Sequence, residues 1–289
     1  MGSRVEKITR KTFKIRESGR SSDYIAPSFG YGCLLNCTYC YMKRHKAEGL
    51  DVATNIETIL TEISNHAWFA TVDKPNQTDP EYITYDIACN EDFALHNKYY
   101  DWQKIFQMFV DHPHAKATLA TKVIPYDFLE FNPKGKVRIR FSLMPQILKD
   151  ELEPNTPNIT SRIKAINMFK SAGYDVHINF SPVVVFDGWL DHYKELFKYV
   201  DAIVDPQYKS EVLAEVIFLT HNGEKHLYNT RNNLPGEHVL WVPEIQEAKT
   251  SEYGGKNIRY RRDLKAGYID QFKKIHDEII PWNTIRYIF

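Results

Sequence analysis

Three of the chain's four cysteines lie within eight residues, and their spacing constrains the protein more than any other feature of its sequence. Cys33, Cys37 and Cys40 are separated by three residues and then by two. Thiols this close in sequence can bind one metal centre, and three is one ligand fewer than closed zinc sites and ordinary [4Fe-4S] clusters have. The spacing therefore predicts a [4Fe-4S] cluster in which one iron keeps a position for an exogenous ligand.

A zinc site is the alternative for this loop. Its fourth ligand would be His45 or the distant Cys89. Zinc sites usually combine two paired halves, such as CxxC with CxxC or HxxxH, and this loop is a single half. Three buried cysteines without a ligand are less expected still, because clustered thiols in a reducing cytosol mostly serve metal binding or catalysis.

Composition limits the class of protein. The 289 residues fit one large domain or one domain with an appendage, and 43% are hydrophobic, enough for a sizeable core. Lys+Arg and Asp+Glu are both 37, so no global basic excess indicates nucleic-acid binding, and any such binding needs a local patch. No apolar run has the length of a membrane span, and the N-terminus has no apolar signal segment. We therefore expect a cytoplasmic protein that does not enter a membrane.

The order of the elements predicts an α/β fold. Strand patterns cover 24–29, 82–88, 136–142, 176–185 and 202–204, with an apolar stretch at 115–121, and helical patterns cover 55–67, 99–110, 126–131, 160–172 and 189–199. Six such alternations favour a parallel sheet wound with crossover helices, with the chemistry at the carboxyl ends of the strands.

The two ends of the chain differ from this central part. Residues 1–22 form a basic arm that we expect to be solvated or frayed, and residues 23–205 form the α/β domain. Residues 206–289 are an appendage with strands at 239–242 and 257–262, joined by a polar segment that contains Gly254 and Gly255. A helix at 264–280 and a closing stretch at 284–289 follow.

The predicted hairpin of the appendage is a candidate DNA contact. It contains a basic patch interleaved with an aromatic residue, made of Lys256, Arg259, Tyr260, Arg261 and Arg262. This pattern suits phosphate contact and base wedging. The alternative is an ordinary edge strand whose charges prevent aggregation.

The cysteine spacing, with Tyr39 before the last cysteine, resembles the radical SAM (S-adenosylmethionine) superfamily. An ordered set of segments resembles, more specifically, the spore photoproduct lyase family: 39–41, 87–92, 120–122, 138–142, 152–156 and Arg162. The similarity runs from about residue 24 to the C-terminus. It implies a partial (β/α)6 TIM-type barrel with a small C-terminal hairpin-plus-helix appendage, in a short member whose N-terminal domain is reduced.

The resemblance also implies a reaction and its cofactors. A [4Fe-4S] cluster passes an electron to SAM, which yields a 5'-deoxyadenosyl radical. In this family the radical takes a hydrogen from C6 of the lesion 5-thyminyl-5,6-dihydrothymine in DNA, the bond joining the two thymines breaks, and an allylic thymine radical accepts a hydrogen atom. The implied partners are DNA and an electron donor such as a flavodoxin or a ferredoxin.

Residue roles follow from the same resemblance. Cys89 matches the family's hydrogen-atom donor, and Tyr39 and Tyr41 match tyrosines that support return of the radical to 5'-deoxyadenosine. The positions expected to contact SAM are Lys122, Ser142, Glu91 and Tyr39. The alternatives are structural: a buried strand-end thiol for Cys89, a snorkelling surface lysine for Lys122 and a strand-end serine for Ser142.

Two departures from the family, the reduced N-terminal domain and a changed segment after Cys89, keep another substrate open, and a function of a different class is weighed beside them. The chain has Asn90, Glu91 and Asp92 where the family has Thr-Ser-Asp beside the donor cysteine. A radical SAM enzyme that modifies another pyrimidine nucleotide in DNA is therefore the first alternative. A non-catalytic zinc or iron–sulfur nucleic-acid-binding module is the second, although such a module does not need six strand–helix alternations.

Overall fold

The computed structural model describes residues 5–18, 20–44, 46, 49–70, 74, 78–250 and 255–289. His45, weighed above as a zinc ligand, and Gly254, in the predicted hairpin turn, lie outside these residues. The chain divides by its internal contacts into two units, which are described separately. The first comprises residues 1–34, 42–141 and 165–177, and the second comprises 35–41, 142–164 and 178–289. The boundaries given above at 22/23 and 205/206 stay a prediction.

The first unit is built on parallel strands. β6 (Ile83–Asp86), β7 (Ala115–Thr121) and β8 (Val137–Leu143) are adjacent and parallel, and β3 (Tyr24–Ile25) pairs with the other side of β6. β2 (Arg16–Glu17) adds an antiparallel strand at this edge. β7 and β8 are buried along nearly their whole length, as expected for parallel strands that are covered on both faces.

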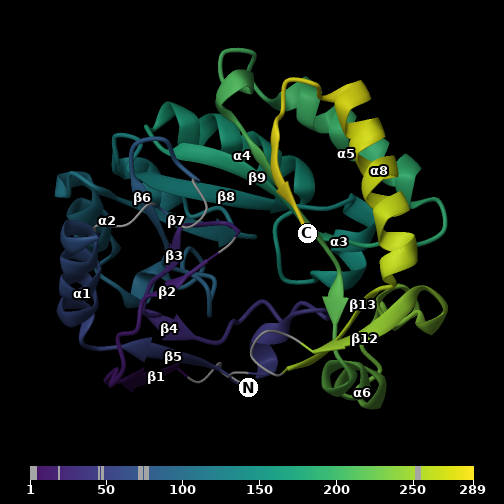
Figure 1. Cartoon of the computed structure of the whole chain (residues 1–289), viewed down its shortest axis with the longest axis horizontal. Helices are drawn as coiled ribbons and strands as arrows, with labels where there is room; N and C mark the ends of the chain where they lie inside the picture. Colours follow the sequence, from purple (N-terminus) through teal and green to yellow (C-terminus); the bar gives the residue numbers. More distant parts are fainter. Residues whose placement is uncertain are drawn as a thin grey trace. The chain divides into compact units, whose positions relative to one another are not determined.

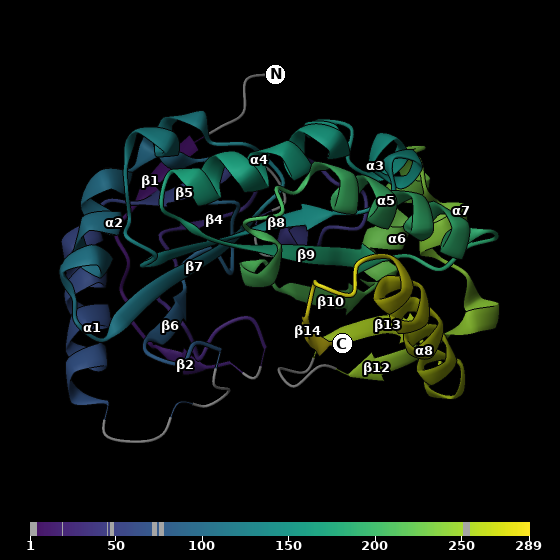
Figure 2. The same ribbon diagram turned by 90° about the horizontal axis from the view of Figure 1, so that it is seen from above.

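Two helices cover this part of the sheet. α1 (Ile56–Phe69) and α2 (Trp102–Asp111) lie side by side, and α2 packs on β7 (Figures 1 and 2). Ile59, Leu60 and Ile63 form the buried stripe of α1, because residues three and four apart share a helix face. The 3-10 helix η2 (Asn97–Tyr99) precedes α2, and η3 (Tyr126–Glu130) follows β7 where a short helix was predicted.

The N-terminal segment pairs with the rest of the first unit. β1 (Val5–Ile8) is parallel to β5 (Leu50–Ala53), which also pairs with β4 (Gly30–Tyr31). The Asn55 side chain accepts from the Arg10 N–H at 2.9 Å and donates to the Arg10 carbonyl at 3.1 Å. The expectation of a solvated or frayed arm is therefore wrong for residues 5–10, because ladder and side-chain hydrogen bonds fix their backbone.

The second unit continues the parallel arrangement. β9 (Asp175–Val183), β10 (Ala214–Phe218) and β14 (Ile285–Ile288) are adjacent and parallel, and the last residues of β8 lie beside β9. α5 (Trp189–Ile203) and α8 (Arg262–Ile279) pack against each other (Figure 1). The Phe197 and Phe272 ring centroids are 5.3 Å apart in an edge-to-face contact, which places aromatic packing at the centre of this core.

Short elements complete the second unit. α3 (Gln146–Leu152) follows β8, and α4 (Ile159–Ser171) runs on into the first unit and ends just before Gly173, as predicted. Gly173 has a φ of 91°, which suits glycine at a helix C-terminus. A small antiparallel sheet has the order β11 (Thr220–His221), β13 (Lys256–Tyr260), β12 (Gln246–Thr250). The remaining elements are α6 (Gly223–Arg231), α7 (Glu237–Leu240), η4 (Lys209–Glu211) and η5 (Pro243–Ile245).

Three predicted elements differ from the structure. Residues 202 and 203 end α5, and the strand expected at 202–204 is instead β10. The apolar run at 239–242 enters α7, and the partner of β13 begins at Gln246. The closing stretch does not stay in the appendage, because β14 pairs with β10 in the main sheet. Short apolar runs do not distinguish strand from helix by themselves, which explains the first two errors.

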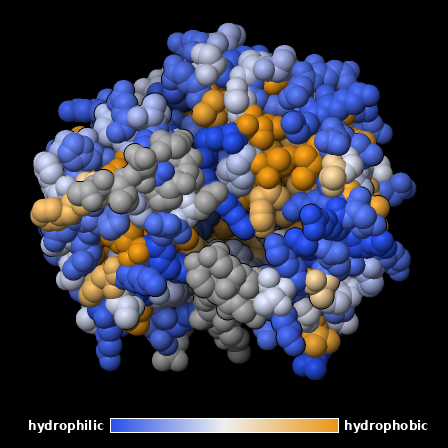
Figure 3. All heavy atoms as spheres, viewed as in Figure 1, coloured by the Kyte–Doolittle hydropathy of each residue, from blue (hydrophilic) through white to orange (hydrophobic). Residues whose placement is uncertain are grey.

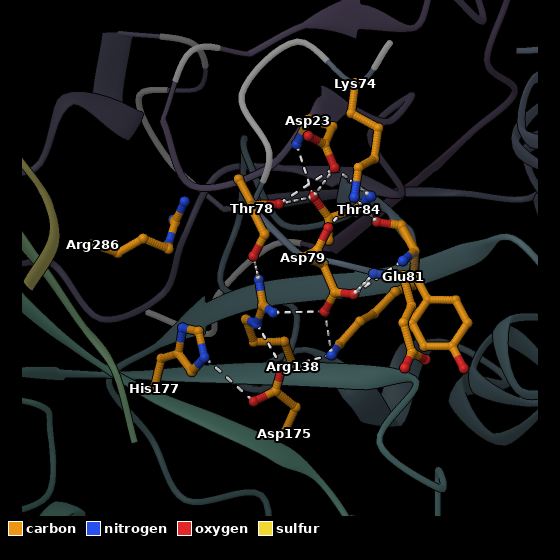
Figure 4. A network of polar contacts seen from close by, with 12 residues as sticks. Asp23, Lys74, Thr78, Asp79, Glu81, Thr84, Arg138, Asp175, His177 and Arg286 are labelled. Carbon is orange, nitrogen blue, oxygen red and sulfur yellow. Dashed lines mark hydrogen bonds and ion pairs between the residues drawn. The ribbon is translucent and has the colours of Figure 1, made fainter. Parts of the chain in front are cut away.

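A buried ionic network closes the amino-terminal ends of strands in the first unit (Figure 4). Lys116 and Arg138, each the second residue of its strand, contact the Asp79 carboxylate at 2.8 and 3.0 Å. The same two cations contact the Asp175 carboxylate, both at 2.7 Å, and His177 lies 3.3 Å from it. Because every charge here faces an opposite one, the interior tolerates them at this end of the sheet.

These observations confirm the α/β fold of partial-barrel type. Over the described residues, no helix is both long enough and apolar enough to span a membrane. Hydrophilic residues prevail on the face of the molecule that Figure 3 shows.

Candidate functional site

The cysteine loop lies between β4 and the 3-10 helix η1 (Tyr41–Arg44). None of the four cysteines, all of them described, is disulfide-bonded, and Cys37 is buried while Cys33 and Cys40 are half-buried. Gly32 opens the loop with a φ of 98°, and a Cβ there would lie 2.6 Å from the Gly49 carbonyl oxygen, so the turn requires glycine. The division into units falls inside this loop, after Leu34.

The chemistry of the donors fits an iron–sulfur cluster. Among the described residues, no three histidine, cysteine or acidic side chains are grouped closely enough to hold a metal ion. The fit therefore rests on the ligand set: one short loop carries three thiols that form no disulfide. Three thiolates complete the coordination of three irons of a cubane and leave the fourth for SAM.

Three predicted site residues of the first unit lie at one edge of the sheet. Cys89 and Glu91 follow β6, and Lys122 directly follows β7. β6 and β7 are parallel neighbours in the register Asp86 opposite Thr118, so their carboxyl ends meet at the same edge. This is the end of the strands at which parallel α/β barrels carry their chemistry, opposite the ionic network.

The Cys89 thiol lies near the ion pair of Asp86 and Arg140, whose side chains are 2.8 Å apart. Burial, followed by the Asp86 carboxylate, raises the pKa of Cys89 to about 12, although Arg16 and Arg140 act in the opposite direction. The group therefore stays a thiol at neutral pH. It keeps the S–H bond that a hydrogen-atom donor needs.

Glu91 is a buried carboxyl group beside the cysteine loop's entry strand. Its Oε2 accepts from the Tyr100 hydroxyl at 2.7 Å and lies 3.3 Å from His96 Nδ1. A Cβ on Gly30 would lie 2.7 Å from this oxygen, so the close approach depends on glycine. Within the described part of the chain, the buried Oε1 has no hydrogen-bond partner.

Burial raises the pKa of Glu91. An ammonium group placed beside its Oε1 would offset that cost and supply the missing donor. The residue thus fits the amino group of SAM.

Asp92 fixes the strand end that carries Lys122. Its carboxylate accepts from the Thr121 hydroxyl at 2.9 Å and from the Lys122 N–H at 3.1 Å. The Lys122 side chain is half-buried. These two hydrogen bonds fix the backbone at Lys122. The position of the lysine is therefore defined, which suits a contact between its ammonium group and the carboxylate of SAM.

In the second unit, one hydrogen-bonded chain joins Tyr39 to Ser142. The Tyr39 hydroxyl donates to the Glu153 carboxylate, whose Oε2 accepts from Arg162 Nη2 at 2.6 Å. Arg162 Nη1 donates to the Ser142 carbonyl at 2.9 Å, and the Ser142 hydroxyl accepts from Asn179 at 3.5 Å. Burial, followed by the Glu153 charge, raises the pKa of Tyr39 well above its usual value.

Tyr41 begins η1 and is 50% exposed.

The hairpin residues differ in what they can reach. Tyr260 is 1% exposed, and its hydroxyl accepts from the Val185 N–H at 2.7 Å, so in this structure its ring packs in the core and cannot contact a base. Arg259 pairs with Glu247 at 2.9 Å and Arg261 with Asp263 at 2.7 Å. Lys256 and Arg262 are exposed and have no ion pair among the described residues.

The structure adds residues to which sequence reasoning gave no role. Glu153 and Arg162 are both 0% exposed and were noticed only as part of a resembling segment. Glu153 lies outside every predicted element and Arg162 lies in the helix predicted at 160–172, where a charge is ordinary, so neither gave a signal of its own. Tyr100 and His96 gave none either, because only the fold places them against Glu91.

The parallel α/β sheet, the three-cysteine loop and the candidate residues at the strand ends define the class of protein: a radical SAM enzyme. Comparison with known proteins narrows the class. The family model described as spore photoproduct lyase matches residues 5–289, so the chain belongs to the spore photoproduct lyase family. As a member it is a radical SAM lyase, whose cofactors are a [4Fe-4S] cluster and SAM. The zinc alternative for the cysteine loop is therefore not retained.

Individual relatives agree. The chain is 24% identical over 283 residues to a spore photoproduct lyase of Bacillus subtilis (strain 168), an alignment that covers 96% of this chain and 80% of the relative. It is 25% identical over 193 residues to one of Geobacillus sp. (strain Y412MC61), covering 65% and 54%. The fold matches a solved spore photoproduct lyase mutant with bound AdoMet and dinucleoside spore photoproduct, with a TM-score of 0.86 and 19% identity over 99% of this chain and 82% of that one.

Proposed function

We propose that this chain reverses 5-thyminyl-5,6-dihydrothymine in DNA to two thymines without excising them. The observation that carries the proposal is the position of the half-buried Cys89 thiol at the strand edge that also holds Glu91 and Lys122. Membership of the family and the dinucleoside spore photoproduct bound to a structural relative support the same substrate.

The residues of this chain divide into three tasks. Cys33, Cys37 and Cys40 hold the cluster. Glu91 takes the amino group of SAM, Lys122 its carboxylate, and Ser142 with Tyr39 the remaining part of the cofactor. With SAM bound, the cluster supplies the 5'-deoxyadenosyl radical that removes hydrogen from C6 of the lesion.

Cys89 completes the repair. After the bond between the thymines has broken, its S–H bond breaks homolytically and the hydrogen atom forms a C–H bond on the allylic thymine radical. Cys89 is left as a thiyl radical. Tyr39 and Tyr41 then pass a hydrogen atom to Cys89 and recover one from 5'-deoxyadenosine, so that the cofactor is restored.

The partners follow from this chemistry. DNA presents the damaged pair outside the helix, because a stacked base cannot reach a radical in the protein. Lys256 and Arg262 are the hairpin cations best placed to contact phosphates, since Arg259 and Arg261 already have carboxylate partners. A flavodoxin or a ferredoxin reduces the cluster, and the reducing cytoplasm is the proposed location.

The deciding experiment is anaerobic. The protein is reconstituted with iron and sulfide, and dithionite, SAM and ultraviolet-irradiated thymine-containing DNA are added. Restored thymine supports the lyase, with a smaller amount of 5'-deoxyadenosine beside it because the cofactor is recycled. Deoxyadenosine without thymine would favour the alternative of another pyrimidine substrate, which the departure at Asn90 and Glu91 suggests. A protein that binds only zinc and never cleaves SAM would contradict both.

A further inference from the structure

The N-terminal segment lines a pocket of about 300 Å³ in the first unit. Its charged lining residues are Arg10, Lys14 and Arg16, and its polar wall includes Ser28, Tyr31 and Asn90. The volume is at the lower end of the range for ligand sites. Among the described residues no acidic side chain lines it, although the whole chain has a formal net charge of +0. Local charge of one sign in a neutral chain indicates an anionic ligand.

Contacts within the first unit hold Arg10 in place at the wall of the pocket. Asn55 holds the Arg10 backbone on both its N–H and its carbonyl. The Arg10 guanidinium lies 4.6 Å from the centre of the Tyr31 ring, a cation–π arrangement that orients it. The guanidinium is thus held in place at the wall of the pocket, where its positive charge attracts an anion.

Another part of the pocket wall lies next in sequence to the proposed hydrogen-atom donor. Asn90 donates to the Ser28 hydroxyl at 2.5 Å and follows Cys89 directly in the chain, so their Cα atoms are about 3.8 Å apart. Arg16, at the same pocket, is near enough to Cys89 to influence its charge. The pocket therefore lies close enough to Cys89 for a phosphate that flanks a thymine pair at Cys89 to reach it.

We infer that Arg10, Lys14 and Arg16 form a phosphate-binding pocket for the DNA strand that flanks the lesion. The inference rests on the proposed function, since it takes the lesion to sit at Cys89. It assigns to the N-terminal segment a contact with DNA that the sequence suggested only for the C-terminal hairpin. The ligand chemistry is a phosphodiester, and a free phosphate or nucleotide is the other source of the same chemistry.

The test compares anaerobic holoenzyme variants in binding fluorescent single-stranded thymine oligonucleotides by anisotropy at several salt concentrations. Arg10→Gln with Lys14→Gln is expected to weaken binding about tenfold and to reduce the salt slope by about 1 to 1.5, near 0.7 for each single-strand phosphate that is no longer neutralised. Lys11→Gln is the matched control, because Lys11 is an exposed cation of the same segment that does not line the pocket. It should stay within about twofold of the parent protein.

A second substrate separates a phosphate contact from a structural role. With a dinucleoside lesion that lacks flanking phosphates, the ratio of oligonucleotide affinity to dinucleoside affinity should fall in the double variant and not in the control. An equal loss for both substrates, or a double variant that behaves like Lys11→Gln, would overturn the inference. Inorganic phosphate that blocks dinucleoside turnover at low millimolar concentration would reassign the pocket to a free anion.

Two results keep the test interpretable. If the double variant does not fold, Lys14→Gln alone replaces it, because Lys14 is exposed and its substitution disturbs little packing. If the parent protein repairs no lesion but the double variant still binds the oligonucleotide more weakly than the control, the proposed function fails and the pocket remains a phosphate site without an assigned lesion.

Discussion

The hydroxyl of Tyr39 donates a hydrogen bond to the carboxylate of Glu153, 114 residues later in the chain. Glu153 in turn holds the buried Arg162, which anchors the Ser142 carbonyl. The tyrosine that directly precedes the last cysteine is thus oriented by Glu153, just after α3, and by its partner Arg162 in α4. Protein side chains alone thus connect the cysteine loop to the end of β8.

Replacement of this tyrosine by phenylalanine should separate repair from cofactor recovery. Tyr39→Phe removes one hydrogen bond while Glu153 keeps Arg162, so we expect a loss of stability of about 1 kcal/mol. Thymine should still form, but the amount of 5'-deoxyadenosine released per thymine should rise, because the hydrogen atom is no longer returned. Tyr199→Phe, at a residue 56% exposed on α5, is the control. An unchanged product ratio would remove Tyr39 from the radical pathway.

Cys89→Ala should stop the last step and leave the earlier ones intact. Cluster absorbance and SAM cleavage are expected to stay at parent levels, since Cys89 lies outside the cysteine loop. Restored thymine should fall about tenfold or more, equivalent to about 1.4 kcal/mol or more of barrier, with other products of the allylic radical in its place. Chromatography of the reaction products gives both quantities. Loss of the cluster in this variant would make Cys89 a ligand instead.

The pKa of Cys89 predicts a pH dependence of reactivity and of stability. The thiol ionises near 9 when unfolded and at about 12 when folded, so between these values the unfolded chain loses a proton that the folded one keeps. Stability from this group is full below pH 9 and declines as the pH rises toward 12.

The corresponding measurement is alkylation by iodoacetamide at about pH 9, followed by mass spectrometry, in folded and in urea-unfolded protein. Only the thiolate reacts, so Cys89 should react far more slowly in the folded protein. Cys89→Ala identifies the modified peptide. Equal rates in the two states would show that the thiol is not protected.

The hairpin allows cations with and without a carboxylate partner to be compared for their contribution to DNA binding. Lys256→Gln with Arg262→Gln should weaken DNA binding and reduce its salt slope, by about 0.7 to 0.9 for each phosphate that is no longer neutralised. Arg261→Gln is the comparison, because this exposed arginine already pairs with Asp263. Anisotropy across a salt series measures both. If the two variants bind alike, the hairpin does not contact DNA through Lys256 and Arg262.

The sequence patterns predicted the architecture because a parallel sheet consists of a repeated unit, a buried strand followed by an amphipathic helix. Each buried strand and amphipathic helix is visible within its own residues, so β6 to β9 and α5 were placed close to their observed bounds. The patterns placed Cys89 and Lys122 at strand ends for the same reason. β14 was assigned to the appendage because its pairing with β10, about 70 residues earlier, leaves no local trace.

The site was less predictable where two distant segments make one feature. The pocket at Arg10 requires β1 to pair with β5, and a basic N-terminal run is more often solvated than folded. The burial of Tyr260 follows from its contact with Val185, 75 residues earlier. Neither relationship can be read from charge or hydrophobic periodicity alone.

Removal of one partner from the ionic network at the amino-terminal ends of the strands should destabilise the first unit. Asp175→Asn leaves Arg138 and Lys116 with one carboxylate fewer in a buried setting, which costs about 3 to 5 kcal/mol. Asp191→Asn is the control, because its pair with Lys194 is 80% and 41% exposed, and its effect should stay within about 0.5 kcal/mol.

The contribution of Asp175 to stability should also depend on pH. His177, Arg138 and Lys116 hold the pKa of Asp175 well below its usual range despite burial. Its contribution is therefore complete above the unfolded value of 3.8 and is lost as the pH falls through the folded pKa. Urea unfolding at about pH 7 and about pH 4 should show a large loss in Asp175→Asn at both values, and further acidification should narrow the gap between the variant and the parent. A gap that is small at neutral pH, or constant down to the lowest pH at which the parent folds, would mean that the network is neutral to folding.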